Sequence, residues 1–478
     1  MTTQRFEKVL FIVIPYESGR YSQPYNPPAS LGYLSEYLKQ RGIKYDVLDL
    51  SLGYSYAKLK EKVRSFQPDL IGASLFTFQY QYAYCFFDRL KTDFPGIKII
   101  AGGPHVSILK EEILTQALSL DYAVIGEGEE TLYELCRGTP VPLIKGLAFR
   151  DNNKSIYNGP RPFITELDIL PFPTYDKFEL KKYLEKRIPI ISSRGCPHSC
   201  VFCSVPKICG QRVRFRTPDH VVSEIKYWLE RGIHTFPIMD DNFVLWKARV
   251  HAICDRMIQS QFPALNFFCP NGVRADCLDK PLLQKMKQAG FTELSFGVEV
   301  GNNRMLKLIK KNETMEQIEK AIRESVELGY HITLFFIIGF PGETFDDFLD
   351  CVRLALKYPV FTAKFFNLIP YPGTELYEYL KKNDLFLVQP EEYFNKATHS
   401  INVPVFKTRE MSIDERMNAF KTGTQTEIQV VRNFLRNKYS KVWLVRSILS
   451  LMPLKFILNL YWNNRLFRKI VSKIRYYL

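Results

Sequence analysis

The chain has 478 residues, of which 46% are apolar and 24% are charged. This length argues against a single ordinary core and favours two domains plus an appendage. Its ten cysteines lie mostly singly, which argues against a disulfide scaffold and favours a reducing, cytoplasmic compartment. The formal net charge is +15, and eleven of those charges follow Glu427, after which no acidic residue remains. No segment has the roughly eighteen uninterrupted apolar residues of a membrane span.

The first apolar run, "VLFIVI" (9–14), is short and precedes "PYESGRY", which has no small-residue cleavage site. We therefore expect a buried strand rather than a signal peptide. Similar runs recur at 45–50, 70–76, 97–103 and 121–129, with helical patterns between them. Near-continuous β-branched strands between amphipathic helices are typical of a parallel α/β sheet. Residues 1–150 are predicted to form a Rossmann-like (flavodoxin-like) domain, whose ligand binds beyond the carboxyl ends of the strands.

Residues 151–187 are rich in Asn, Pro and Gly and are predicted to be a linker. Over residues 188–385, six strand-like runs alternate with helix-like segments. Because a closed barrel needs about eight such units, we expect a partial (β/α)6 TIM barrel, with its chemistry at the C-terminal ends of the strands. Residues 386–478 are expected to form a C-terminal extension with basic amphipathic helices.

The stretch "SSRGCPHSCVFCSVP" follows the first barrel strand and holds Cys196, Cys200 and Cys203 in a C-x3-C-x2-C spacing. These thiols fit an iron-sulfur cluster, a structural zinc or a chance grouping. Zinc sites usually take four protein ligands from paired two-cysteine knuckles, and no second C-x2-C occurs in the sequence. A cluster tolerates one iron that is bound by something other than a thiolate. The spacing favours the cluster and leaves zinc open.

With Phe202 before its last cysteine, the motif resembles that of the radical S-adenosylmethionine (SAM) superfamily. The barrel segments "MDDNF", "FGVEVGNNRML", "FIIGFPGET" and "IPYPGTELY" resemble that family too. The segments "NPPASLGYLSEYL", "AGGPHVS" and "VIGEGEETLYEL" resemble the cobalamin-binding domain that one subclass carries. Together the resemblance covers roughly residues 8 to 385.

The resemblance implies that Cys196, Cys200 and Cys203 ligate a [4Fe-4S] cluster whose fourth iron takes the amino and carboxylate groups of SAM. The other implied SAM contacts are Asp240 and Asp241 at the methionine end, Glu299 at the ribose, Gly339 and Glu343 after the fifth strand, and Phe202, Leu368 and Ile369 around the adenine.

Plainer roles stay open for several of these residues. Asp240 and Asp241 also fit helix caps, and Glu299 also fits an ordinary carboxylate at the barrel rim. Asn271 and Arg274 either face the substrate or anchor a loop. We do not expect Cys209 to be a fourth ligand, because the family often carries an aromatic residue at that place.

The resemblance also implies a cobalamin site at the ligand end of the first sheet, where glycines let a ligand approach the backbone. The predicted cofactor residues are Ser74, Thr77, Gly102, Gly103, Pro104, His105, Glu127 and Gly128. The sequence lacks the D-x-H-x-x-G motif of some cobalamin proteins, so we expect no protein histidine on cobalt. A domain that kept the fold and lost the ligand is the alternative.

We therefore predict a cobalamin-dependent radical SAM enzyme that cleaves SAM to a 5'-deoxyadenosyl radical and methylates an unactivated carbon. A radical cyclase or rearrangement enzyme with the same cofactors is the first alternative. A non-catalytic iron-sulfur or zinc protein at the membrane is the alternative of another class. Expected partners are a small-molecule substrate, such as a lipid or tetrapyrrole, and an electron donor such as flavodoxin or ferredoxin. The tail from residue 428 favours a membrane surface over a packed appendage, and nucleic acid least of all.

Overall fold

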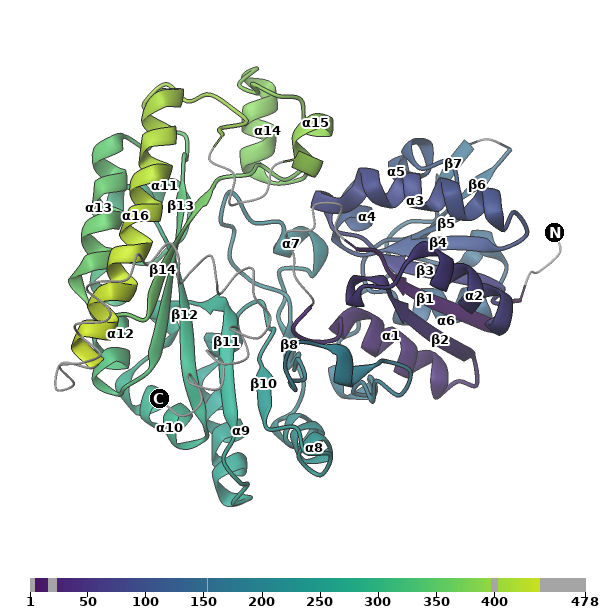
Figure 1. Ribbon diagram of the computed structural model, residues 1–478, viewed down its shortest axis with the longest axis horizontal. Coiled ribbons are helices and arrows are strands. Elements are labelled where there is room, and N and C mark those ends of the chain that lie inside the picture. The colour runs from purple at the N-terminus through teal and green to yellow at the C-terminus, as the bar shows by residue number, and fades with distance from the viewer. Residues whose placement is uncertain (1–4, 16–23, 153, 397–402, 439–478) are drawn as a thin grey trace.

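The computed structural model describes residues 5–15, 24–152, 154–396 and 403–438. Figure 1 shows two α/β units side by side, each built on its own sheet, with the short helix α7 (Val205–Ile208) between them. The α/β class predicted from the alternating pattern is therefore confirmed.

In the described part of the chain, the first sheet has seven strands in the order β2-β1-β3-β4-β5-β6-β7. Strands β1 to β5 are parallel and coincide with the five predicted runs. The sheet then continues as an antiparallel hairpin into the predicted linker. The strands are β1 (Lys8–Val13), β2 (Lys44–Asp49), β3 (Leu70–Ser74), β4 (Lys98–Gly102), β5 (Tyr122–Val124), β6 (Leu147–Asp151) and β7 (Lys154–Tyr157).

Helices separate these strands, as the amphipathic patterns predict. They are α1 (Ala29–Lys39), α2 (Tyr56–Phe66), α3 (Tyr80–Asp93), α4 (Pro104–Leu109), α5 (Glu112–Gln116) and α6 (Glu129–Cys136). Short 3-10 helices lie at η1 (Leu50–Leu52), η2 (Thr77–Gln79) and η3 (Val141–Leu143), and in the linker at η4 (Leu167–Ile169) and η5 (Leu180–Lys182).

Among the described residues, the second sheet has five parallel strands in the order β10-β11-β12-β13-β14. The predicted first barrel strand instead runs beside β10 as an extended segment with isolated bridges, Arg187 to Thr235 and Ile190 to Ile238. The strands are β10 (Thr235–Pro237), β11 (Asn266–Val273), β12 (Phe291–Glu299), β13 (His331–Ile338) and β14 (Thr362–Asn367).

The helices of the barrel other than α9 begin with a side-chain cap, such as the box in which Thr344 and Asp347 bond each other's backbone N–H groups. They are α8 (Pro218–Leu229), α9 (Lys247–Gln259), α10 (Lys280–Gln288), α11 (Asn303–Leu308), α12 (Met315–Glu327), α13 (Phe345–Lys357) and α14 (Glu375–Lys382), with η6 (Phe243–Leu245) and η7 (Ala275–Cys277). A two-stranded hairpin, β8 (Ser193–Arg194) and β9 (Arg214–Phe215), brackets the three-cysteine loop.

The C-terminal extension adds α15 (Pro390–Lys396) and α16 (Ile413–Lys438). Helix α16 lies along β14 and α13 (Figure 1), so it covers the open edge of the partial barrel. There the carboxylate of Glu427 accepts hydrogen bonds from Phe365 N at 2.9 Å and Lys364 Nζ at 3.0 Å. The predicted membrane-surface tail beyond residue 438 lies outside the described residues.

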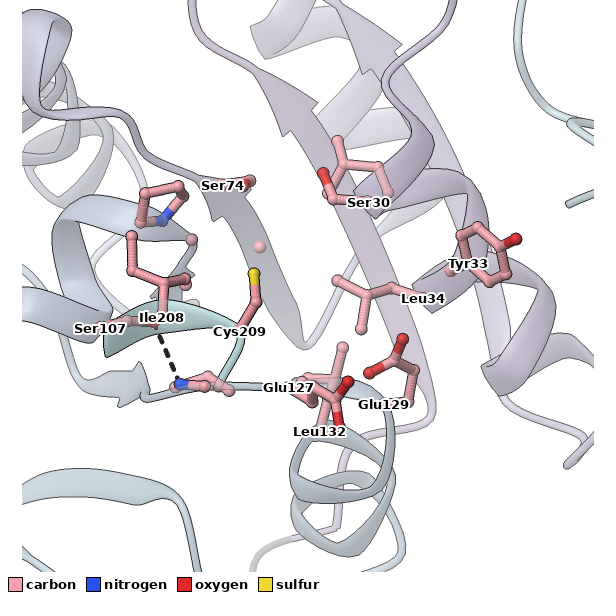
Figure 2. Close-up of a pocket in the computed structure, with 18 of the residues that line it drawn as sticks. Ser30, Tyr33, Leu34, Ser74, Ser107, Glu127, Glu129, Leu132, Ile208 and Cys209 are labelled. Carbon is pink, nitrogen blue, oxygen red and sulfur yellow. Dashed lines mark hydrogen bonds between the residues drawn. The ribbon is translucent and has the colours of Figure 1, made fainter. Parts of the chain in front are cut away.

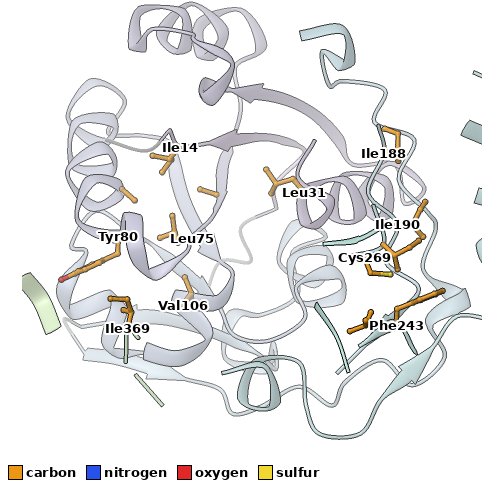
Figure 3. Packing of buried hydrophobic residues seen from close by; sticks show 14 of the residues in the cluster. Ile14, Leu31, Leu75, Tyr80, Val106, Ile188, Ile190, Phe243, Cys269 and Ile369 are labelled. Atoms are coloured by element: carbon orange, nitrogen blue, oxygen red, sulfur yellow. The ribbon is translucent and has the colours of Figure 1, made fainter. Parts of the chain in front are cut away.

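The two units share one hydrophobic core, to which both contribute buried side chains (Figure 3). Tyr80 of the first unit and Ile369 of the second belong to this cluster. The Tyr80 hydroxyl also donates to the carbonyl of Glu391 at 3.0 Å, which ties α3 to the extension. Continuous apolar burial across the boundary fixes how the two ligand ends face each other.

Candidate active site

The three-cysteine loop leaves the barrel through a tight turn at Gly195, whose φ is +98°. A Cβ at this position would lie 2.8 Å from the carbonyl oxygen of Arg212, so a side chain does not fit. Gly195 N donates to Asp241 Oδ2 at 2.9 Å, and Cys196 N donates to the carbonyl of Gly210 at 3.1 Å. The first thiol is therefore held by β10's loop on one side and by the returning hairpin on the other.

The middle of the loop is pinned to the loops after later strands. Val201 N donates to the carbonyl of Ile309 at 3.1 Å, and its own carbonyl accepts from Leu376 N at 2.9 Å. The ring of Phe202 meets that of Phe340 edge to face, with centroids 5.5 Å apart. These contacts bring the cysteine loop to the C-terminal ends of the barrel strands, where barrel chemistry lies.

Burial raises the pKa of all three thiols, that of Cys203 to about 12. For Cys200, burial is the largest effect, and the positive charges of Lys311 and Arg274 oppose it. A thiolate ligand set needs such cations or a bound metal to form, because an isolated buried thiolate is costly. No three His, Cys, Asp or Glu side chains of the described residues surround a single metal-ion position. Three thiols on one loop fit a [4Fe-4S] cluster, in which each thiolate binds a different iron.

Lys311 was missed by sequence reasoning, because it lies in a loop after α11 with no periodic or motif signal. Its ammonium Nζ lies 3.3 Å from Glu299 Oε1 and 3.6 Å from Glu313 Oε2. Arg274 Nη1 donates to the Lys311 carbonyl at 2.6 Å, so it anchors this loop beside the cysteines. Asn271 also anchors a loop, since its side chain donates to the Met239 carbonyl at 2.9 Å.

Glu299 ends β12 with a φ of +68°, a left-handed conformation that residues other than glycine seldom adopt. Such backbone strain clusters at ligand sites. With Lys311 beside it, the carboxylate is placed at the strand end that the ribose-binding prediction requires, and that role stays a prediction.

Gly339 and Glu343 form one structural unit after β13. Glu343 Oε2 accepts hydrogen bonds from Gly339 N at 2.5 Å and Phe340 N at 3.0 Å. Burial raises the pKa of Glu343 to about 7. A Cβ on Gly339, whose φ is +105°, would lie 2.6 Å from Arg416 Nε of α16. The C-terminal helix α16 thus contacts the predicted SAM motif, and no pattern in the sequence predicts this contact.

The two aspartates after β10 have different surroundings. Asp240 is buried and accepts hydrogen bonds from Ser192 N at 2.6 Å, Ser192 Oγ at 2.5 Å and Ser193 Oγ at 2.6 Å. It therefore holds the strand that leads into the cysteine loop. Asp241 holds Gly195 and lines the cavity described next. Leu368 and Ile369 are both buried in the shared core.

A cavity of about 320 Å³ lies between the two units. Its walls combine the ligand end of the first sheet with the segments on either side of the cysteine loop. Figure 2 shows Ile208 and Cys209, from the segment after that loop, near Ser74 and Ser107 of the first unit. Six of the predicted cobalamin residues line it, namely Ser74, Gly102, Gly103, Pro104, Glu127 and Gly128. The barrel side contributes Ser193, Arg194, Cys209, Met239 and Asp241, among others.

Gly103 makes the close backbone approach that this cavity needs. Its φ is +96°, and a Cβ there would lie 2.7 Å from Ser74 Oγ and 2.9 Å from Leu75 N. Gly103 therefore lets the loops after β3 and β4 pack closely, and its bare backbone lines the space where the corrin is predicted to lie.

Thr77 and His105 do not line this cavity. His105 is buried inside the first unit, where its Nε2 lies 2.8 Å from the Tyr84 hydroxyl and its Nδ1 lies 3.3 Å from Thr77 Oγ1. Burial lowers the pKa of His105 to about 4, so the ring is neutral. Both residues stabilise the domain interior below the ligand end.

Glu127 lines the cavity, but its carboxylate binds the other domain. Its Oε1 lies 2.9 Å from Arg194 Nη1 and 2.7 Å from Arg214 Nη1. Arg194 also reaches Glu129 Oε1, at 2.6 Å. We call this cluster of two buried and two partly buried side chains the interdomain clamp (Glu127, Glu129, Arg194 and Arg214). It joins the cobalamin-binding unit to the hairpin that carries the cysteine loop.

Cys209 lies at the end of α7 and lines the interdomain cavity. Figure 2 shows its sulfur pointing into that space, on the side where Ser74 lies. Burial raises the pKa of this thiol to about 12. The expectation that Cys209 is not a fourth cluster ligand stays a prediction.

The comparisons with known proteins agree with this geometry. The Radical SAM superfamily matches residues 190–355, and the B12 binding domain matches residues 21–136. An uncharacterized methyltransferase of Pyrococcus horikoshii is 30% identical over 85% of this chain and 89% of its own. The anaerobic magnesium-protoporphyrin IX monomethyl ester cyclase of Cereibacter sphaeroides is 28% identical over 87% of this chain and 70% of its own.

Two solved structures share the fold of the whole arrangement. The cobalamin-dependent S-adenosylmethionine radical enzyme OxsB has a TM-score of 0.71 at 17% identity, over 98% of this chain and 75% of its own. The radical S-adenosylmethionine methyltransferase TsrM of Kitasatospora setae has a TM-score of 0.68 at 19% identity, over 87% and 86%. The chain belongs to the cobalamin-dependent radical SAM methyltransferase family, whose cofactors are a [4Fe-4S] cluster, SAM and cobalamin.

Proposed function

We propose that this enzyme transfers a methyl group to an unactivated carbon of a small, largely apolar molecule. One observation carries the proposal: residues on both sides of the cysteine loop, Arg194 and Cys209, line the same cavity as Ser74 and Gly103 of the first sheet. A corrin against the glycines would therefore lie beside the loop that carries the cluster ligands. When bound, the three cofactors supply a hydrogen-abstracting radical and a transferable methyl group.

The chain's own residues supply position and charge. Cys196, Cys200 and Cys203 would hold the cluster, and Lys311 and Arg274 lower the cost of forming thiolates there. The Asp241 carboxylate fixes the turn at Gly195, so it sets where the first thiol points. Such fixed positioning matters because radical transfer requires the reacting carbon to be held within contact distance.

For the substrate class, we propose a flat, apolar molecule such as a tetrapyrrole. Relatives named for a tetrapyrrole reaction support it, namely the protoporphyrin ester cyclase above and a bacteriochlorophyllide d C-8(2)-methyltransferase of Chlorobaculum tepidum. A ring-forming reaction on such a molecule is the second candidate, because the alignment with the cyclase relative covers 87% of this chain.

Product analysis separates the two reactions. The reconstituted enzyme, reduced with dithionite in the presence of SAM and a cell extract, should form S-adenosylhomocysteine together with 5'-deoxyadenosine if it transfers a methyl group. A substrate gain of one methyl group should accompany them. 5'-Deoxyadenosine without S-adenosylhomocysteine, and a substrate lighter by two hydrogens, would instead establish the cyclisation. A Cys203→Ala variant is the control, and it should form neither product.

We also propose that an external protein such as flavodoxin or ferredoxin delivers the electron that reduces the cluster.

We further propose that the basic tail, from residue 428, binds to the surface of a membrane that contains anionic lipid. The composition of the tail, apolar residues interleaved with Lys and Arg, supports the lipid contact. No helix in the described part of the chain has the length and apolar character to cross a bilayer. A chain ending at Lys438 keeps α16 complete and should lose binding to anionic vesicles. Equal binding by both chains would refute the lipid contact.

A further inference from the structure

A second cavity, of about 530 Å³, lies between β9, the first turn of α9 and the linker at residues 165–166. None of its described lining residues belongs to the interdomain cavity. Four arginines line it, namely Arg212, Arg214, Arg216 and Arg249, and among the described lining residues the acidic side chain is that of Glu166. Arg214 and Arg216 already pair with Glu127 and Glu224, whereas Arg212 and Arg249 form no ion pair among the described residues and are the cations that an anionic ligand would meet.

Two of these arginines are 95% buried, with 5% of each residue exposed, and neither is fully paired. Arg249 donates from Nε to the Arg216 carbonyl at 3.0 Å and from Nη2 to the Ser192 carbonyl at 2.7 Å, but its Nη1 has no hydrogen-bond partner in the structure described. Arg214 Nε is likewise without a partner among the described residues. Leaving a buried charged donor unpaired is costly, and both donors belong to side chains that line this cavity, so an acceptor that binds there could satisfy them.

The start of α9 adds a third source of positive potential. Its first turn reads "KARV" and holds no acidic residue, and Trp246 at the cap has an indole that cannot accept a hydrogen bond. The first N–H groups of the helix therefore point outward with the positive end of the helix dipole. Phosphate groups bind at such helix starts. Burial also lowers the pKa of Arg249 to about 10, which a bound anion would reverse.

Aromatic rings form the other half of the cavity wall. Trp246 is 54% exposed, unusual for so large an apolar side chain. Its ring centroid lies 5.4 Å from that of Phe215, and the Arg249 guanidinium lies 5.1 Å from the centroid of Phe215. An exposed indole beside cations suits the stacking of a flat heteroaromatic ring whose phosphate reaches the arginines.

We propose that this second cavity binds a small ligand of the nucleotide type, with its phosphate on Arg249, Arg214 and the start of α9 and its base on Trp246. Arg249 also holds Ser192, which in turn is held by Asp240. The ligand would therefore sit one side chain away from the strand that enters the cysteine loop. The inference does not depend on which reaction the enzyme performs.

The test is isothermal titration of the holoenzyme, loaded with cluster and cobalamin and saturated with SAM so that the SAM site cannot take the probe. Adenosine monophosphate, inorganic phosphate and adenosine are the probes. We expect saturable binding of adenosine monophosphate, at least tenfold tighter than that of either phosphate or adenosine.

Variants at the cavity rim avoid Arg249, whose loss would also release Ser192. Ala248→Glu puts a carboxylate in the first turn of α9, where an acid suits the helix but repels an anion. It should weaken adenosine monophosphate at least tenfold, whereas Gln259→Glu, at the exposed far end of α9, should not. Trp246→Ala should weaken adenosine monophosphate and leave phosphate unchanged.

Three results would overturn the proposal. One is the absence of saturable binding by adenosine monophosphate. Another is equal binding by the Ala248→Glu and Gln259→Glu proteins, which would place the ligand elsewhere. The third is phosphate binding as tight as that of adenosine monophosphate, which would remove the base from the site and leave a plain anion site.

Discussion

Removal of Arg194 should weaken the join between the two units more than any exposed charge change. Its guanidinium is shared by Glu127 at 2.9 Å and Glu129 at 2.6 Å, and the Glu129 side chain is only 5% exposed. Glu127 keeps Arg214 at 2.7 Å, so the Arg194→Met variant leaves Glu129 as the carboxylate that loses its cation. Breaking a buried ion pair from one side costs about 3–5 kcal/mol.

A double-mutant cycle isolates this interaction. Arg194→Met, Glu129→Gln and the double variant are compared with the parent by urea unfolding, and we expect a coupling energy of about 2 kcal/mol. The matched control is the surface pair of Arg5 and Glu7, 4.0 Å apart and 67% and 71% exposed, for which the same cycle should give a coupling close to zero. A clamp coupling below about 0.5 kcal/mol would refute the reasoning. The Arg194→Met protein should also release cobalamin faster on gel filtration.

Three further predictions concern the cofactor sites. Cys203→Ala should leave iron and sulfide well below four of each per chain after anaerobic reconstitution, and an unchanged brown protein would contradict the ligand set. Gly103→Ala should cost about 1–3 kcal/mol, because its φ of +96° with a ψ of −176° is a backbone conformation that is almost exclusive to glycine, and it should lose cobalamin absorbance. Gly96→Ala, whose added Cβ meets nothing within 4 Å, should keep that absorbance. Burial raises the pKa of Glu343 from 4.5 to about 7, so the folded chain keeps a proton that the unfolded chain loses between those pH values. This stabilisation, up to about 3 kcal/mol, is complete below pH 4.5 and is lost as the pH rises through 7, and Glu343→Gln should remove that dependence from unfolding curves.

The sequence predicted those parts of the molecule in which one residue pattern has one structural solution. Continuous β-branched runs gave β1 to β5, because parallel strands buried on both faces admit few polar residues. The cysteine spacing located the loop. Glycines such as Gly103 marked the ligand end of the sheet, because only glycine readily combines a positive φ with a close approach of neighbouring backbone.

The features that the sequence did not predict depend on contacts between residues that are far apart in the chain. The β6-β7 hairpin carries polar alternation in a stretch that also contains Asn and Pro, so its composition reads as linker until β5 offers a pairing edge. Glu127 and Asp240 look like ligand carboxylates until Arg194 and Ser192 are seen to bind them. Arg416 reaches Gly339 only because α16 folds back over the barrel, and no local pattern encodes that return.

The hydrogen bonds of Glu427 have a consequence for how this protein is made. Strand β14 ends its sheet, and a bare strand edge readily pairs with another chain. The carboxylate that accepts the hydrogen bond from Phe365 N comes from α16, which leaves the ribosome after all the strands of the barrel sheet. During synthesis the edge of β14 therefore stays unpaired and able to associate with other chains until α16 has folded onto it. Chains truncated before residue 413 should for this reason aggregate rather than fold as shorter soluble enzymes.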